Sequence, residues 1–136
     1  MEITPYDLAH RFLGIKEFEG ENANHQVMAM LKLDSLWPTD DSVPWCSAFV
    51  NYIAWLLGIP RTKSLRARSW LRMGSIVSES RDARVGFDIV ILGRGECFPG
   101  PHIIDAPGHV GFYSKHDAEI MKSAGPSEFA GLGYNK

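Results

Sequence analysis

Cys46 is the residue of this chain with the clearest capacity for nucleophilic chemistry. It begins an apolar stretch that runs to Leu57, and the Gly58-Ile59-Pro60 segment that follows is a typical helix stop. The sequence therefore predicts a buried helix with a thiol in its first turn, where the positive end of the helix dipole favours the nucleophilic thiolate. Free cysteines are also among the most buried residue types, so a packing role is the alternative.

His109 is the preferred partner for such a thiolate, because Gly108 precedes it and Gly111 follows two residues later. Small residues let a substrate backbone approach closely. Alternation along the predicted strand places His109, Gly111 and Tyr113 on one face. A structural role for His109 is the alternative, and further histidines are available at positions 10, 25, 102 and 116.

The elements that position these two residues are helices in the first half of the chain and strands in the second. The predicted helices cover residues 5–13, 25–31, 45–57 and 64–73. The predicted strands cover residues 76–77, 87–92, 109–113 and 119–123. This order predicts one α+β domain over residues 1–136, with N-terminal helices packed on a small antiparallel sheet.

Composition and charge exclude several other classes of protein. A formal net charge of −2 argues against a general nucleic-acid binder. No apolar run is long enough to span a bilayer, so we expect no stable membrane insertion. Residues 1–7 are acidic and lack the basic start and apolar core of a secretory signal, so we expect synthesis in the cytoplasm without a signal peptide.

The sequence predicts no disulfide and no metal site. Cys46 and Cys97 are the two cysteines, and free thiols are the default in a reducing compartment. No cysteine and histidine lie at zinc-ligand spacing. Asp34, Asp40 and Asp41 share a loop, but their spacing matches no calcium-binding pattern, so we expect neither a metal nor a cofactor.

Several segments, taken in order along the chain, resemble one family of hydrolases. They are residues 13–20 (LGIKEFEG), 44–50 (PWCSAFV), 67–71 (ARSWL), 87–90 (FDIV) and 108–113 (GHVGFY). In this combination the chain is similar to the CHAP-like, NlpC-type cysteine peptidoglycan hydrolases, and most of all to their small, single-domain, phage-endolysin branch. One such segment alone is a weak signal, whereas their common order makes the resemblance specific.

The resemblance implies a papain-like fold, with Cys46 as nucleophile and His109 as general base. It implies cleavage of an amide bond in cell-wall peptide, either at the sugar–peptide junction, as an N-acetylmuramoyl-L-alanine amidase, or within the peptide, as an endopeptidase. Trp45, Arg68 and Trp70 belong to the matching segments and are expected to line the substrate cleft, although Trp70 is equally compatible with a core position.

Two features depart from the family pattern. The Gly-Asp pair that precedes the central strand in the family reads Gly86-Phe87-Asp88 here. The polar residue that orients the catalytic imidazole is also absent from its usual place after the histidine strand. Ser127 or Glu128 is the candidate substitute, and Glu128 is the stronger acceptor for an imidazolium N–H, so it is expected to be the third catalytic residue.

The expected partner is bacterial peptidoglycan, reached through a phage holin pore or a secretion apparatus, and the expected state is a monomer. The basic residues Arg61, Lys63, Arg66, Arg68 and Arg72 are interpreted as a solvated face or as a groove that attracts wall polymers. Two other functions remain open. One is a wall-binding or toxin-like module that has lost the chemistry, and the other is an intracellular cysteine peptidase or deamidase.

Overall fold

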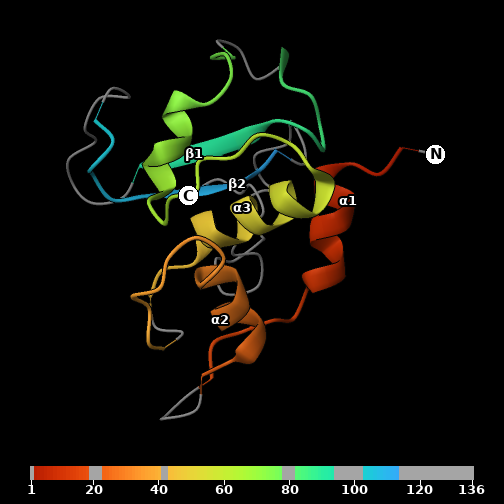
Figure 1. Cartoon of the computed structure of the whole chain (residues 1–136). Coiled ribbons are helices and arrows are strands. Elements are labelled where there is room, and N and C mark those ends of the chain that lie inside the picture. Colours follow the sequence, from red (N-terminus) through yellow and green to blue (C-terminus); the bar gives the residue numbers. More distant parts are fainter. Residues whose placement is uncertain (1, 19–22, 41–42, 78–81, 94–102, 114–136) are drawn as a thin grey trace.

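The computed structural model describes residues 2–18, 23–40, 43–77, 82–93 and 103–113. These residues form short helices and a two-stranded antiparallel sheet, in the α+β class that the sequence predicted. In Figure 1 helix α2 lies below the central helix α3, helix α1 lies at the right-hand end of α3, and the sheet lies above it. Helix α3 packs against both α2 and the strand β2, so it forms the middle of the structure.

The first helical unit is α1 (Pro5–Ala9), which continues into the 3-10 helix η1 (His10–Phe12). Thr4 forms the cap that its sequence predicted: its hydroxyl accepts from the backbone of Asp7 at 3.0 Å, and the Asp7 carboxylate accepts from the backbone of Thr4 at 3.0 Å. Gly14 ends the unit with a φ of 90°, a conformation that glycine adopts without steric cost.

Helix α2 covers His25–Leu31, which are the bounds that the sequence predicted. The Asn24 side chain caps it by accepting from the backbone N–H of Gln26 at 2.9 Å. Val27 and Leu31 lie one helical turn apart and are fully buried. They form the face of α2 that packs against α3.

Helix α3 covers Cys46–Leu57 and supplies the largest part of the core. Its buried apolar residues include Val50 and Ile53, which are 1% and 0% exposed. The helix ends at Gly58, whose φ of 67° is the left-handed conformation that the Gly-x-Pro stop predicted. Cys46 therefore stands at the first position of a well-buried helix.

The segment after α3 forms a 3-10 helix, η2 (Ala67–Arg72), and the predicted α-helix over residues 64–73 is wrong in type and in its start. The hydroxyl of Ser64 accepts from the backbone N–H of Arg66 at 3.2 Å. Arg66 nevertheless keeps an extended backbone, with a φ of −80° and a ψ of 122°, so the helical conformation begins only at Ala67.

The sheet pairs β1 (Ile89–Gly93) with β2 (Gly108–Phe112). Their antiparallel register places Leu92 opposite His109. The two predicted strands at these places are confirmed to within two residues. The predicted strand over residues 76–77 is wrong, because these residues join no sheet and Ile76 is 86% exposed. The predicted strand over residues 119–123 lies outside the described residues.

Candidate functional site

Cys46 has a free thiol and is 8% exposed at the start of α3. The preceding residue, Trp45, is the N-cap, and its side chain makes no capping hydrogen bond to the helix. The amide groups of a first helical turn have no partner within the helix. They are therefore the natural hydrogen-bond donors for an anion that forms beside the Cys46 sulfur.

Trp45 is 8% exposed, so most of its indole ring is buried. The indole N–H donates to the Glu17 carboxylate at 2.9 Å. The ring also meets Phe49 edge to face, with the ring centroids 6.2 Å apart. These contacts fix the residue before Cys46 against both the N-terminal loop and its own helix, and they leave little of the ring to contact a substrate.

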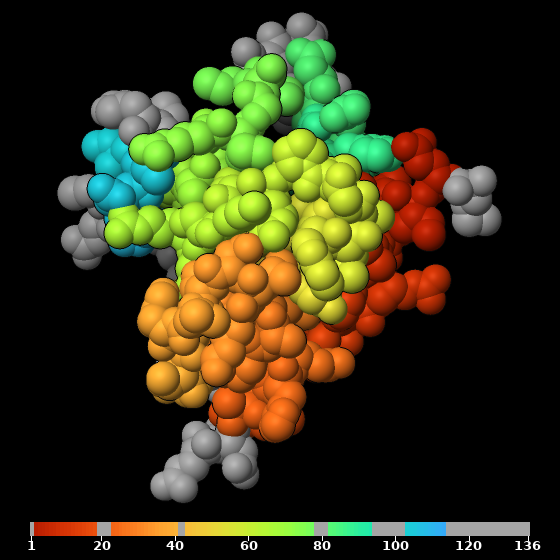
Figure 2. Space-filling view, in the orientation of Figure 1, coloured from red at the N-terminus to blue at the C-terminus, as the bar shows by residue number. Residues whose placement is uncertain are grey.

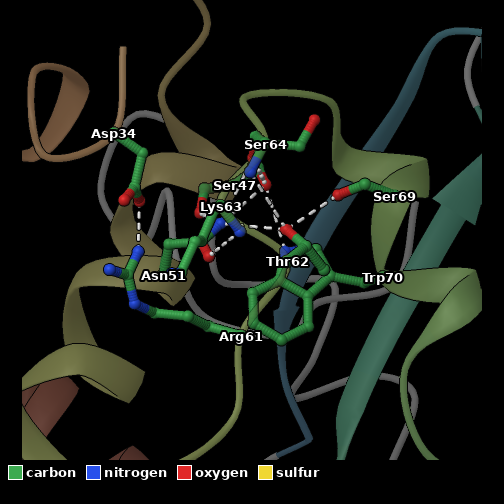
Figure 3. A network of polar contacts seen from close by, with 9 residues as sticks. All are labelled: Asp34, Ser47, Asn51, Arg61, Thr62, Lys63, Ser64, Ser69 and Trp70. Carbon is green, nitrogen blue, oxygen red and sulfur yellow. Dashed lines mark hydrogen bonds and ion pairs between the residues drawn. The ribbon is translucent and has the colours of Figure 1, made fainter.

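Ser47, the residue after Cys46, is fully buried and joined to two other segments. Its hydroxyl donates to the backbone carbonyl of Ser64 at 2.6 Å and accepts from the indole N–H of Trp70 at 3.0 Å. Figure 3 shows Ser47 between the segment that carries Ser64 and the Trp70 ring. The first turn of α3 is thus held from both the 61–66 segment and η2.

Asn51 extends this network one turn further along α3 and is 3% exposed. Its amide nitrogen donates to the Ser47 carbonyl at 2.9 Å and to the Thr62 hydroxyl at 3.2 Å. Its amide oxygen accepts from the backbone N–H of Lys63 at 2.8 Å. The backbone of Lys63 has a φ of 58°, which is uncommon for a residue other than glycine. The hydrogen bond to Asn51 holds Lys63 in this conformation (Figure 3).

His109 lies at the second position of β2 and is 2% exposed. The preceding residue is close-packed: a Cβ atom at Gly108 would lie 2.9 Å from Arg68 Cγ and 2.9 Å from the backbone oxygen of Leu92. A side chain at this position would collide with both neighbours. Gly108 therefore packs against other parts of the protein and does not serve the approach of a substrate, the role that its sequence suggested. The missing side chain makes room for Arg68, a residue forty positions earlier that no local pattern connects to Gly108.

Arg68 is 4% exposed and its Nε–H donates to the backbone carbonyl of Ile103 at 2.7 Å. Trp70 is 5% exposed, which places it in the core, the alternative that its sequence allowed. Arg68 and Trp70, two of the three residues predicted to line a cleft, therefore form internal contacts. One contacts the segment that leads into β2, and the other contacts the residue after Cys46.

The basic stretch does not form one continuous cationic surface. Arg61 pairs with Asp34, and Arg66 pairs with Asp105. Figure 2 shows the cyan surface of the 103–107 segment beside the yellow-green surface of the segment that follows α3. These ion pairs join loops to one another, so the groove interpretation is not supported for Arg61 and Arg66.

The remaining predicted residues are placed as follows. Among the described histidines, His10 and His25 are exposed, and His109 is the buried one. The described residues contain no group of three or more histidine, cysteine, aspartate or glutamate side chains that would hold a metal ion. Outside the described residues lie Cys97, His102, His116, Ser127 and Glu128.

The hydrogen-bond network around Ser47 and Asn51 was not predicted from the sequence, although the sequence contains a pattern that indicates it. Ser47 and Asn51 are polar residues four positions apart in an otherwise apolar helix. Residues at that spacing share one helix face. Because buried polar groups require partners, this pair predicts a polar segment packed against that face.

Comparisons of this chain with protein-family models, curated proteins and solved structures found no match. Across the part of the chain that the structure describes, no helix has both the length and the apolar character required to cross a membrane.

Proposed function

We propose that this protein is a papain-like cysteine hydrolase that cleaves an amide bond in the peptide of bacterial peptidoglycan, with Cys46 as nucleophile and His109 as base. One observation carries the proposal. Cys46 begins α3, His109 lies on β2, and the two elements pack against each other. Thiolate catalysis requires a histidine within reach of the thiol, and the packing of the element that carries Cys46 against the strand that carries His109 supports this pairing.

The proposed reaction proceeds through a thioester. His109 accepts the thiol proton, and the Cys46 sulfur attacks the amide carbonyl carbon. Backbone N–H groups at the start of α3 stabilise the oxyanion that forms on the carbonyl oxygen. The C–N bond then breaks and the imidazolium protonates the leaving amine. His109 next takes a proton from water, which hydrolyses the thioester and releases the carboxylic acid and the free thiol.

A third residue is proposed to hold the far nitrogen of the imidazole, with Glu128 as the first choice and Ser127 as the second. A carboxylate stabilises the imidazolium that forms during the reaction. If Glu128 has this role, Glu128→Ala lowers turnover by a factor on the order of ten to a thousand. If Glu128→Ala is fully active, the mechanism reduces to a Cys46–His109 dyad.

The experiment that tests the function is digestion of purified cell wall, followed by mass spectrometry of the soluble fragments. Wild-type protein and Cys97→Ser are expected to release fragments, and Cys46→Ser is expected to release none, because a hydroxyl lacks the nucleophilicity of a thiolate. New amino groups on intact stem peptides would indicate amidase activity, and shortened peptides would indicate endopeptidase activity. An inert wild-type protein would reject the proposal.

A wall-binding module without catalysis is the second candidate, and the low exposure of both residues favours it. A substrate carbonyl must contact the sulfur, yet Cys46 is 8% exposed and His109 is 2% exposed. Sedimentation of the protein with insoluble wall separates the two functions. Binding without fragment release, in wild-type protein and in Cys46→Ser alike, would establish the second candidate.

A further inference from the structure

The 3-10 helix η2 contacts the chain neighbours of both proposed catalytic residues. Trp70 bonds to Ser47, which follows Cys46, and Arg68 packs against Gly108, which precedes His109. We infer that η2 is a positioning helix that sets the separation of the Cys46 sulfur from the His109 imidazole, with Trp70 and Arg68 as positioning residues. The inference rests on the proposed function, because it assigns these residues a role in that reaction.

The contact on the cysteine side is directional. Trp70 has one donor, its indole N–H, and that donor bonds to the buried Ser47 hydroxyl at 3.0 Å. The same hydroxyl donates to the Ser64 carbonyl, so its hydrogen and one of its lone pairs are both used. A change at Trp70 therefore changes the position of the first turn of α3, which carries the Cys46 sulfur.

The contact on the histidine side is steric and polar. The stem of Arg68 occupies the space where Gly108 lacks a side chain, and its Nε–H bonds to the Ile103 carbonyl at 2.7 Å. Arg66, two residues before Arg68, forms an ion pair with Asp105, two residues after Ile103. The Arg68 contacts thus hold the segment that enters β2 and, with it, the strand position of His109, whereas the exposed Arg66–Asp105 pair contributes little.

Because η2 is short, a shift of the helix would alter both the Trp70 contact with Ser47 and the Arg68 contact with Gly108. Arg68 and Trp70 are two residues apart, which corresponds to about 4 Å of axial rise in a 3-10 helix. Both side chains are engaged in internal contacts, with the Ile103 carbonyl and the Ser47 hydroxyl respectively. Both act through the residues they hold, and loss of either contact changes the geometry of the pair while leaving the thiol and the imidazole chemically intact.

The test measures alkylation of Cys46 by iodoacetamide between pH 5 and pH 10, with all variants made in a Cys97→Ser background. Trp70→Phe removes the indole N–H and keeps an aromatic ring, and Arg68→Met removes the guanidinium and keeps most of the stem. The matched controls are Trp55→Phe on the exposed part of α3 and Arg72→Met at the exposed end of η2. His109→Ala provides the profile of an unpaired thiol.

Both positioning variants are expected to lose about tenfold of the alkylation rate near pH 6, where the reaction depends on the imidazole to accept the thiol proton, and to stay within about twofold of wild type near pH 10. The controls should match the wild type. Arg68→Lys should regain part of the loss, because an ammonium restores a donor for the Ile103 carbonyl. Ser47→Ala removes the Trp70 bond from its other end and is expected to give the same profile as Trp70→Phe.

Two outcomes would overturn the inference. The first is a wild-type profile in Trp70→Phe, Ser47→Ala and Arg68→Met. The second is faster alkylation at every pH, which indicates a loosened core that exposes the buried thiol. Failure of the proposed function gives a different result: the wild-type profile depends on His109 and on η2, but purified cell wall is not cleaved.

Discussion

Asn51→Ala tests the network behind Cys46 through the stability of the whole fold. The substitution removes the donor to the Ser47 carbonyl and to Thr62, and it leaves the backbone N–H of Lys63 without its 2.8 Å acceptor. Each hydrogen bond contributes about 1 kcal/mol net, and an unsatisfied buried donor costs about 1–3 kcal/mol. The better helix propensity of alanine offsets about 0.5 kcal/mol.

The expected result is a loss of about 2–4 kcal/mol in the free energy of unfolding. In urea, with a slope of about 2 kcal/mol/M, this lowers the unfolding midpoint by about 1–2 M. Asn51→Asp keeps the acceptor for Lys63 but places a carboxylate against the carbonyls of Ser47 and Ser64, so it should destabilise at least as much. Gln26→Ala, an exposed amide on α2, is the control and should stay within about 0.5 kcal/mol. The reasoning is refuted if Asn51→Ala also stays within that range.

Three further predictions concern single residues. Gly108→Ala should destabilise by about 1–3 kcal/mol in urea unfolding, because the new Cβ would meet the Arg68 stem and a backbone oxygen at 2.9 Å, and a wild-type midpoint would contradict this close packing. Hydrogen bonds from the backbone and side chain of Thr4 hold the pKa of Asp7 below its ordinary value. Its contribution to stability is therefore present above the ordinary carboxyl pKa and is lost as pH falls through the lower folded value, so Asp7→Asn should flatten the acid side of a stability–pH profile. Burial raises the pKa of Tyr113, so its phenol should ionise above the ordinary tyrosine range in an ultraviolet titration, and the contribution it makes to stability should be lost as pH rises through that folded value.

The sequence predicted the local elements well where the signals for their ends were strong. Helix α2 has a cap at Asn24, and α3 ends at the left-handed Gly58, as its Gly-x-Pro stop indicated. The 64–73 segment was expected to form a helix because Ser64 can cap one and Gly74 can close it, whereas the backbone stays extended as far as Arg66 and forms only the 3-10 helix η2. The strand predicted over residues 76–77 has β-branched residues but no partner strand among the described residues.

The candidate site was predictable only in part. Cys46 and His109 are distinguished by local features, a helix start and flanking glycines, so a single sequence is enough to propose them. The positions of Arg68 and Trp70 depend on contacts with residues more than twenty positions away in the chain. No local pattern encodes such pairings, and for that reason a cleft-lining role was expected where the structure has internal contacts.

The proposed mechanism is tested most directly by trapping the thioester. Wild-type protein would be mixed with soluble peptidoglycan fragments, quenched in acid within a single turnover, and mapped by mass spectrometry. We predict an acyl adduct on the peptide that contains Cys46, absent from Cys46→Ser and unaffected by Cys97→Ser. An adduct of the sugar's own carboxyl group with no amino acid attached would indicate amidase chemistry, and one that carries residues of the stem peptide would indicate an endopeptidase. Fragment cleavage that persists in Cys46→Ser, with no adduct on the wild-type thiol, would contradict the mechanism.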